Sequence, residues 1–348
     1  MLNTSRYAFG ICALAFAACA LVLLKLTWDV PKPMLLFAAA TYTLSLVIFE
    51  STCRIPNHSK RNKIALLTVV WFVTAASILA VLFRLDRAGW WWFQATGYDF
   101  VIEERLPGSP RMSVALFLQQ APFFSVAEGE PDTILLRAGT YEIDRTLVIP
   151  AGTKVRIEPG AVLQFGAAAS LVSYSPIIAQ GTPEAPIVFM AQHYWRKWGS
   201  VGIVGGQGSV FKHTVFESGR RAQVNGVNFF GALSLIDSQA DVSHSTFRNL
   251  KGKDGLYVVD GHIMIHDNRF ENCSKDGLDL QGAEGEVFNN TFIDCADEGM
   301  DLSENEAVRV YDNIILDRRG GRLEAEQNYD AIVAANFLGY SRRMRQSH

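Results

Sequence analysis

Asp276-Gly-Leu-Asp-Leu280 and Glu298-Gly-Met-Asp-Leu302 are two copies of a short unit that recurs along the second half of the chain. An earlier copy begins at Lys253-Asp-Gly-Leu256, and the glycine of each copy lies 22 residues after the previous one (277 − 255 and 299 − 277). Within each copy apolar and polar residues alternate, which is the periodicity of a β-strand with one buried face. A short fixed period broken by Asn and Gly turns indicates one coil of a solenoid.

A right-handed parallel β-helix is the fold that this repeat predicts. Each strand would pair with its equivalent one coil away, so equivalent side chains would stack in columns. Phe247, Phe270 and Phe292 should therefore form an internal ladder. Cys273 and Cys295 also share one position, and the strand spacing of about 4.8 Å is compatible with a disulfide. A pair of reduced, buried thiols is the alternative.

The strand pattern covers residues 132–322, which we assign to the β-helix. Residues 88–131 precede it as a linker and N-terminal cap, and Arg111–Gln120 within them has the pattern of a short amphipathic helix. Residues 323–348 lose the pattern, so we expect a C-terminal cap or tail there.

One coil is longer than the others. Phe216 and Phe247 are equivalent but lie 31 residues apart (247 − 216), and the additional residues fall around Ser218–Asn228. A long insertion in a regular solenoid often contributes to the functional face.

Residues 1–87 are predicted to form a three-helix transmembrane anchor, because a bilayer is crossed by about 20 apolar residues. The three apolar segments are Tyr7–Leu26, Met34–Phe49 and Ile64–Phe83. The loop between the second and third segments carries four basic residues, Arg54, Lys60, Arg61 and Lys63. Such loops stay in the cytoplasm. The chain is therefore expected to be an integral membrane protein in contact with lipid. Its transmembrane α-helices would precede an all-β domain on the extracytoplasmic side, in the periplasm or at the cell surface.

The charge balance argues against a nucleic-acid partner. The formal net charge is −3, and no broad basic stretch offers the electrostatic footprint that nucleic acid requires.

Several turn motifs resemble those of a known superfamily. They are Gly181-Thr-Pro-Glu-Ala-Pro-Ile-Val-Phe189, Trp198-Gly199, Asn225-Gly226 before Gly231-Ala-Leu-Ser234, and the Asp-Gly-Leu-Asp-Leu units. Together they resemble right-handed β-helix domains of the pectate-lyase-like superfamily, in particular the β-helix regions that accompany CotH-type, spore-coat-kinase-like proteins. The resemblance covers about residues 132–317. It implies the fold, whereas the superfamily includes lyases, hydrolases, epimerases and binding proteins, so it leaves open whether this protein is an enzyme.

A strip of carboxylates is the strongest candidate site. Its members recur at the repeat spacing, which places them about 5 Å apart on neighbouring coils. They are Asp276, Asp279, Asp297, Glu298 and Asp301. A pair about 5–5.5 Å apart suits a retaining glycosidase and one about 6.5–9.5 Å apart an inverting one. Alternatively Asp279 and Asp301 could bind Ca²⁺, which takes six to eight oxygen ligands. Ordinary solvated turn residues are the third interpretation.

Basic residues accompany the strip, namely Lys253, Lys275, Arg220 and Arg221. In lyases of the superfamily Ca²⁺ holds an acidic sugar and a basic residue removes a proton, so the resemblance implies such roles for these four. No motif identifies a catalytic residue. The remaining candidates are histidines spread over several coils, interpreted as surface or ladder residues: His213, His244, His262 and His266.

These observations predict a membrane-anchored extracytoplasmic β-helix protein. We expect it to bind or organise a cell-envelope polysaccharide or an envelope protein partner. The alternative is a polysaccharide lyase, hydrolase or epimerase that acts next to the membrane.

Overall fold

The computed structural model describes Glu104, Leu106 and residues 111–193, 197–305, 307–317, 321–328 and 332–340. These residues belong to one of two compact units of the chain, Asp99–His348. The three segments predicted to cross the membrane lie outside the described residues. Within the described part, no helix combines the length and the apolar character that crossing a membrane requires.

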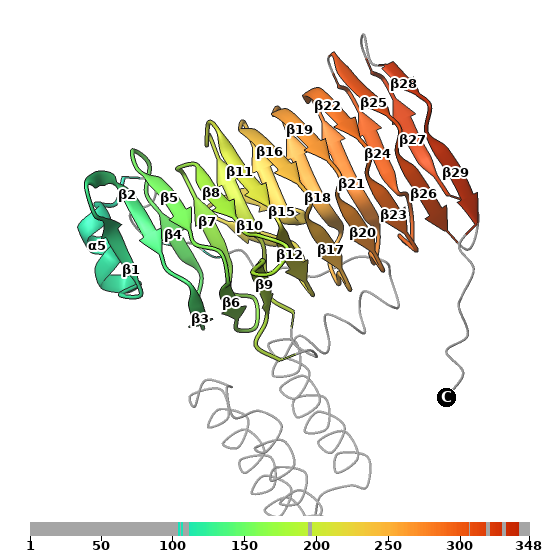
Figure 1. Ribbon diagram of the computed structural model, residues 1–348. Coiled ribbons are helices and arrows are strands. Elements are labelled where there is room, and N and C mark those ends of the chain that lie inside the picture. The colour runs from blue at the N-terminus through green and yellow to red at the C-terminus, as the bar shows by residue number, and fades with distance from the viewer. Residues whose placement is uncertain are drawn as a thin grey trace, which may run out of the picture. The chain divides into compact units, whose positions relative to one another are not determined.

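The described residues of this unit form an all-β solenoid, with three long sheets of ten, eight and nine strands. Strands that follow one another in a coil belong to different sheets, and equivalent strands of neighbouring coils pair in parallel (Figure 1). This is the arrangement that the 22-residue repeat predicts.

The ten-stranded sheet contains, in spatial order, β1 (Phe124–Ala127), β2 (Glu130–Leu136), β5 (Lys154–Ile157), β8 (Ile177–Gln180), β11 (Ser209–Lys212), β16 (Gln239–Ser243), β19 (His262–His266), β22 (Glu284–Phe288), β25 (Val308–Tyr311) and β28 (Ile332–Ala334). The eight-stranded sheet contains β4 (Leu147–Ile149), β7 (Leu171–Ser173), β10 (Val201–Val204), β15 (Gly231–Ile236), β18 (Asp254–Val259), β21 (Asp276–Gln281), β24 (Met300–Ser303) and β27 (Leu323–Glu326). The nine-stranded sheet contains β3 (Gly139–Ile143), β6 (Ala161–Phe165), β9 (Ile187–Ala191), β12 (Thr214–Glu217), β17 (Thr246–Arg248), β20 (Arg269–Glu271), β23 (Thr291–Ile293), β26 (Ile314–Asp317) and β29 (Phe337–Tyr340).

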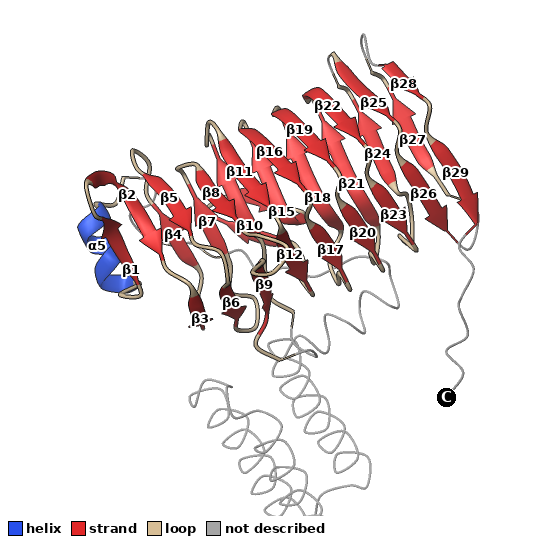
Figure 2. Cartoon of the chain, in the orientation of Figure 1, coloured by secondary structure: helices blue, strands red, loops and turns tan. Residues whose placement is uncertain are grey.

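The predicted amphipathic helix is present as α5 (Val114–Gln120), at the end of the solenoid where the strands begin (Figure 2). Ser113 caps it, because its hydroxyl accepts a hydrogen bond from the backbone N–H of Leu116. Phe117 is fully buried and packs 5.2 Å from the ring of Phe124 in β1. β1 pairs antiparallel with β2. The helix and this strand therefore cover an end that would otherwise expose unpaired edges.

The predicted phenylalanine ladder is confirmed and is longer than expected. Neighbouring rings stack with centroids 4.6–4.8 Å apart, and all of them are fully buried. The ladder consists of Phe189, Phe216, Phe247, Phe270 and Phe292. Because Phe216 and Phe247 are neighbours in it, the 31-residue coil keeps the same inner register as the others.

A second column inside the solenoid is made of asparagines. Its members are Asn268, Asn290, Asn313 and Asn336. Each of the first three side chains donates to the carboxamide oxygen of the next at 3.0 Å and also to a backbone carbonyl. The ladder thus satisfies its buried polar atoms from one coil to the next.

Cys273 and Cys295 are buried free thiols, which settles the alternatives in favour of the reduced pair. Burial, together with the neighbouring Cys295, raises the pKa of the Cys273 thiol well above its usual range. The two cysteines therefore act as small apolar groups in the core.

The solenoid extends beyond residue 322, where we expected it to give way to a cap or tail. β27, β28 and β29 pair in parallel with β24, β25 and β26 and form a further coil. The apolar side chains of this coil are exposed; Phe337, for example, is 60% exposed. Its sequence therefore lacks the clear alternation of apolar and polar residues that identifies a strand. The spacing of the asparagines could have indicated this coil, because Asn336 continues the internal ladder.

The insertion around Ser218–Asn228 folds into a hairpin of β13 (Ala222–Val224) and β14 (Val227–Phe229). It packs on the outer face of the eight-stranded sheet, where Val148, Val172 and Phe229 form part of a second hydrophobic cluster. The ring of Phe229 lies against Gly202, where a Cβ atom would come within 2.4 Å of it. The hairpin therefore covers the apolar part of this outer face.

Candidate functional site

The polar part of the same outer face carries an acidic cluster, which we define as Asp254, Asp276, Asp279, Asp297, Glu298 and Asp301. The repeat explains why these residues meet. Asp254 and Asp276 begin β18 and β21 and are direct neighbours in the sheet. Asp279 and Asp301 pair in the same way between β21 and β24.

Four residues of the acidic cluster, the three aspartates Asp254, Asp276 and Asp279 together with Glu298, are buried, whereas Asp297 and Asp301 are partly exposed. Asp254, Asp276 and Asp279 are each only 1% exposed, and their carboxylate oxygens converge to within 4.8 Å of one another. Asp276, Asp297 and Glu298 converge in the same way. The interpretation of these residues as solvated turns therefore does not apply to the three buried aspartates.

Three basic side chains partly neutralise the cluster. The Lys253 ammonium lies 3.2 Å from Asp279 Oδ2 and 3.7 Å from Asp254 Oδ2. Lys275 Nζ lies 3.3 Å from Asp297 Oδ2. Arg322 pairs with both Asp297 and Glu298. Within the described residues, these ion pairs set three cations against six carboxyl groups.

Burial, together with the neighbouring negative charges, raises the pKa values of several carboxyl groups. Burial, reinforced by the charges of Asp279 and Asp276, raises the pKa of Asp254 well above its usual range despite the attraction of Lys253. Burial also raises the pKa of Glu298 to about 7, and a hydrogen bond with Asp276 adds to this. The pKa of Asp301 rises to about 6 through burial and the charge of Asp279. Perturbed carboxyl groups of this kind are common in functional sites.

Some buried oxygens of the cluster have no hydrogen-bond partner. They are both carboxylate oxygens of Asp254 and Oδ1 of Asp279. An unsatisfied buried acceptor destabilises a fold by about 1–3 kcal/mol. The missing hydrogen bonds indicate that a proton or a cation binds to these oxygens.

Aromatic and basic residues adjoin the cluster on the side of the hairpin. Lys253 Nζ lies 4.9 Å from the centre of the Phe230 ring, and the Arg221 guanidinium lies 6.0 Å from the same ring. Tyr257 packs edge-on against Phe230 at 5.1 Å. The contacts of Phe230 with Lys253 and with Tyr257 join the residue after the hairpin to the coil that carries Asp254.

All nine residues predicted for the site lie in this region, but with different surroundings. The five acidic ones and Lys253 and Lys275 belong to the cluster or pair with it. Arg221 reaches its edge through Phe230. Arg220 is 5% exposed, and its backbone N–H donates to the carbonyl oxygens of Trp198 and Gly199. Arg220 is therefore anchored in the wall of the solenoid next to the cluster.

Asp254, Tyr257, Phe230 and Arg322 were not predicted. Asp254 was detectable, because it precedes Asp276 by one repeat and both stand directly before a glycine. Phe230 follows the insertion and Arg322 follows the last regular turn, so no repeat position marks either of them.

The comparisons with known proteins agree with the fold. Residues 197–338 match the family model described as the right handed beta helix region, so the chain contains a β-helix domain. Searches of the curated proteins and of the solved structures found no match.

Proposed function

We propose that this protein binds a polysaccharide on the outer face of the eight-stranded sheet, where the hairpin meets the acidic cluster. The supporting observation is the combination of the half-buried Phe230 ring, the partly exposed Lys253 and the charge-rich cluster on one face. Sugar rings pack on aromatic side chains, and their hydroxyl groups form hydrogen bonds with charged groups. Lys253 and Lys275 would hold an acidic sugar, and Asp297 and Asp301 would accept from hydroxyl groups.

Ca²⁺ is the cation that fits the buried part of the cluster. Asp279 and Asp301 were possible Ca²⁺ ligands in one of the three interpretations of the sequence, whereas Asp254, Asp276 and Asp279 are the residues whose oxygens converge. Carboxylate oxygens are the ligands that Ca²⁺ prefers. Both oxygens of Asp254 and Oδ1 of Asp279 are buried without a hydrogen bond, and the Lys253 ammonium, 3.7 Å from Asp254 Oδ2, offsets only part of their charge. A bound ion would offset the repulsion between the stacked carboxylates.

The cellular setting is part of the proposal. The apolar segments within residues 1–87 and the basic loop between two of them support a membrane anchor with the β-helix on the extracytoplasmic side. The resemblance to β-helix regions of CotH-type proteins agrees with a role in the cell envelope. An envelope protein is the other partner that such a surface could bind.

A second candidate function is cleavage or epimerisation of the same polysaccharide. The observation that favours it is the pKa of about 7 at Glu298 and about 6 at Asp301. Carboxyl groups that titrate near neutral pH are suited to general acid and base catalysis.

A binding and turnover experiment on the full-length protein in detergent tests both functions. Acidic and neutral polysaccharides are screened with and without Ca²⁺, and Asp301→Asn and Lys253→Gln are compared with the control Asp312→Asn. Asp312 is an exposed turn residue at a different corner of the solenoid. Binding that is lost in the first two variants and kept in the control supports the proposal.

Absence of binding to every polysaccharide, or equal binding by all variants, would contradict it. New reducing ends would instead identify a hydrolase, unsaturated ends a lyase, and an altered sugar configuration an epimerase.

A further inference from the structure

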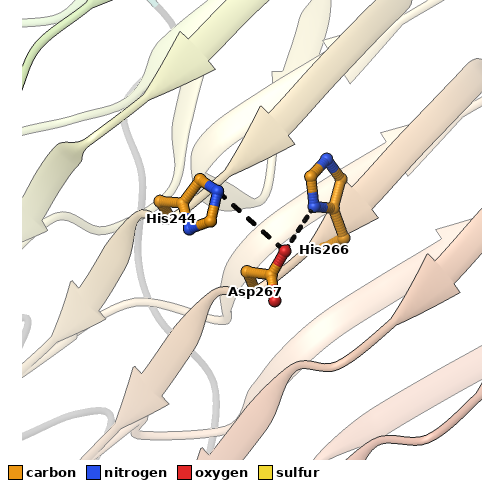
Figure 3. Close-up of side chains that lie close together, drawn as sticks. All are labelled: His244, His266 and Asp267. Atoms are coloured by element: carbon orange, nitrogen blue, oxygen red, sulfur yellow. Dashed lines mark hydrogen bonds and ion pairs between the residues drawn. The ribbon is translucent and has the colours of Figure 1, made fainter.

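A separate group of side chains meets at the corner that follows the ten-stranded sheet. His266 is the last residue of β19, and its Nδ1 lies 2.7 Å from Oδ2 of the adjacent Asp267. His244, one coil earlier, directs its Nε2 to the same oxygen at 4.0 Å (Figure 3). The potential ligand atoms of these three residues all lie within 4.8 Å of one another.

The repeat holds this group in place. His244 and Asp267 both have positive φ angles, 49° and 56°, because they occupy the same turn position in successive coils. The His213 ring stacks on His244 at 5.1 Å, and the Phe288 ring stacks on His266 at 4.9 Å. Each imidazole is therefore oriented before any ligand arrives, which lowers the entropy lost on binding.

An independent observation concerns the other nitrogen of His266. Its Nε2 lies 3.7 Å from Asp241 Oδ1, an oxygen that is buried without a hydrogen-bond partner. Histidines that bind metal ions usually direct their second ring nitrogen to a carboxylate, which fixes the tautomer and the ring orientation. Asp241 lies where it could orient the His266 ring in this way.

We propose that His244, His266 and Asp267 bind Zn²⁺ or a similar divalent transition-metal ion. Two imidazole nitrogens and a carboxylate oxygen are typical ligands of such ions. Bond lengths of about 2.0–2.2 Å in a tetrahedral site separate the ligand atoms by about 3.3–3.5 Å. The present separations of 2.7 and 4.0 Å lie on either side of this value.

Small side-chain rotations would equalise these distances. His244 is 41% and Asp267 35% exposed, so the fourth position of the ion would be open to water or to an external ligand. The ion would also link two neighbouring coils of the solenoid at this corner.

Titration of the full-length protein with Co²⁺, followed by displacement with Zn²⁺, tests this site. Co²⁺ reports a tetrahedral site by its visible absorption. We expect one tight site with that spectrum, absent in His244→Gln and in His266→Gln. Asp241→Asn should weaken binding about 10–100-fold, as is usual for a group that orients a ligand.

Two matched variants serve as controls. Asp312→Asn changes the equivalent turn position two coils after Asp267, and His262→Gln removes an exposed histidine from β19 itself. Both should bind Co²⁺ as the unaltered protein does. If His266→Gln does not fold, Asp267→Asn decides the matter, because asparagine tolerates a positive φ angle.

The proposal is overturned if the unaltered protein shows no tetrahedral Co²⁺ spectrum. It is also overturned if His244→Gln and Asp267→Asn bind as tightly as the controls do.

Discussion

The asparagine ladder and the acidic cluster are two stacks of polar residues built by the same repeat. They differ in whether their buried polar atoms form hydrogen bonds. In the ladder, Asn290 donates to the backbone oxygen of Ile265 and to Asn313, and it accepts from Asn268. In the cluster, Asp254 has two buried oxygens without a hydrogen-bond partner. An amide both donates and accepts, so a column of amides satisfies itself, whereas a column of carboxylates repels itself.

The two stacks therefore have different roles, one structural and one proposed to be functional. A stack that completes its own hydrogen bonds is sufficiently explained by stability. A stack that lacks them is where we propose that the protein binds a ligand. The acidic cluster is the second kind, and the phenylalanine and asparagine ladders are the first.

The largest effect is expected inside the phenylalanine ladder. Phe270→Ala removes a fully buried ring that stacks 4.6 Å from both neighbours. It should lower the free energy of unfolding by about 3–5 kcal/mol, measured by urea unfolding followed by circular dichroism. A loss below about 1 kcal/mol would contradict the packing described for this ladder.

Replacing an amide by a carboxylate in the asparagine ladder should destabilise the fold, whereas the reverse replacement in the acidic cluster should not. Asn290→Asp removes donors from a position that faces three acceptors, and it should cost on the order of 3 kcal/mol at neutral pH. Asp254→Asn relieves a buried carboxyl whose pKa is raised, so without Ca²⁺ it should leave the melting temperature unchanged or raise it.

Melting curves of both variants at pH 7 in the presence of a chelator provide the measurement. Equal destabilisation by the two substitutions would mean that the stacks do not differ in the way described.

A smaller effect is expected from pH. The pKa values of Glu298 and Asp301 are raised to about 7 and about 6 from ordinary values of 4.5 and 3.8. Over this interval the folded protein binds more protons than the unfolded chain, so the free energy of unfolding should fall as pH rises from about 4 to 7. The double variant Glu298→Gln/Asp301→Asn should show a flatter pH dependence than Asp312→Asn does. A stability that rises over the same interval in the unaltered protein and in the double variant alike would contradict the raised values.

The repeat made most of the solenoid predictable, because one period defines both the strand pairing and the inner columns. Phe247, Phe270 and Phe292 stack as their spacing indicates, and Arg111–Gln120 contains the helix that caps the first coil. The last coil was missed because its apolar residues face solvent and its pattern is weak.

The sequence predicted most of the residues of the candidate site, but not their burial. Sequence spacing brings Asp276, Asp279 and Asp301 together, but it does not reveal that the first two are buried. Residues from outside the repeat also contact the site: Arg322 pairs with Glu298, and the Phe230 ring packs against Tyr257. The group of His244, His266 and Asp267 could have been predicted in part, since Asp267 occupies the turn position of His244 one coil later and His266 directly precedes it. The role of Asp241 became visible only in the structure.

The central claim is that the acidic cluster holds a cation, and a calcium titration of the full-length protein tests it most directly. At a hundredfold excess of Ca²⁺ over Kd, the free energy of unfolding should rise by about 2.7 kcal/mol. Asp254→Asn/Asp279→Asn should abolish this increase, because it removes two ligands while it preserves the shape of the column. Asp312→Asn should retain it. A melting temperature that Ca²⁺ leaves unchanged in the unaltered protein, or raises equally in the double variant, would contradict the claim.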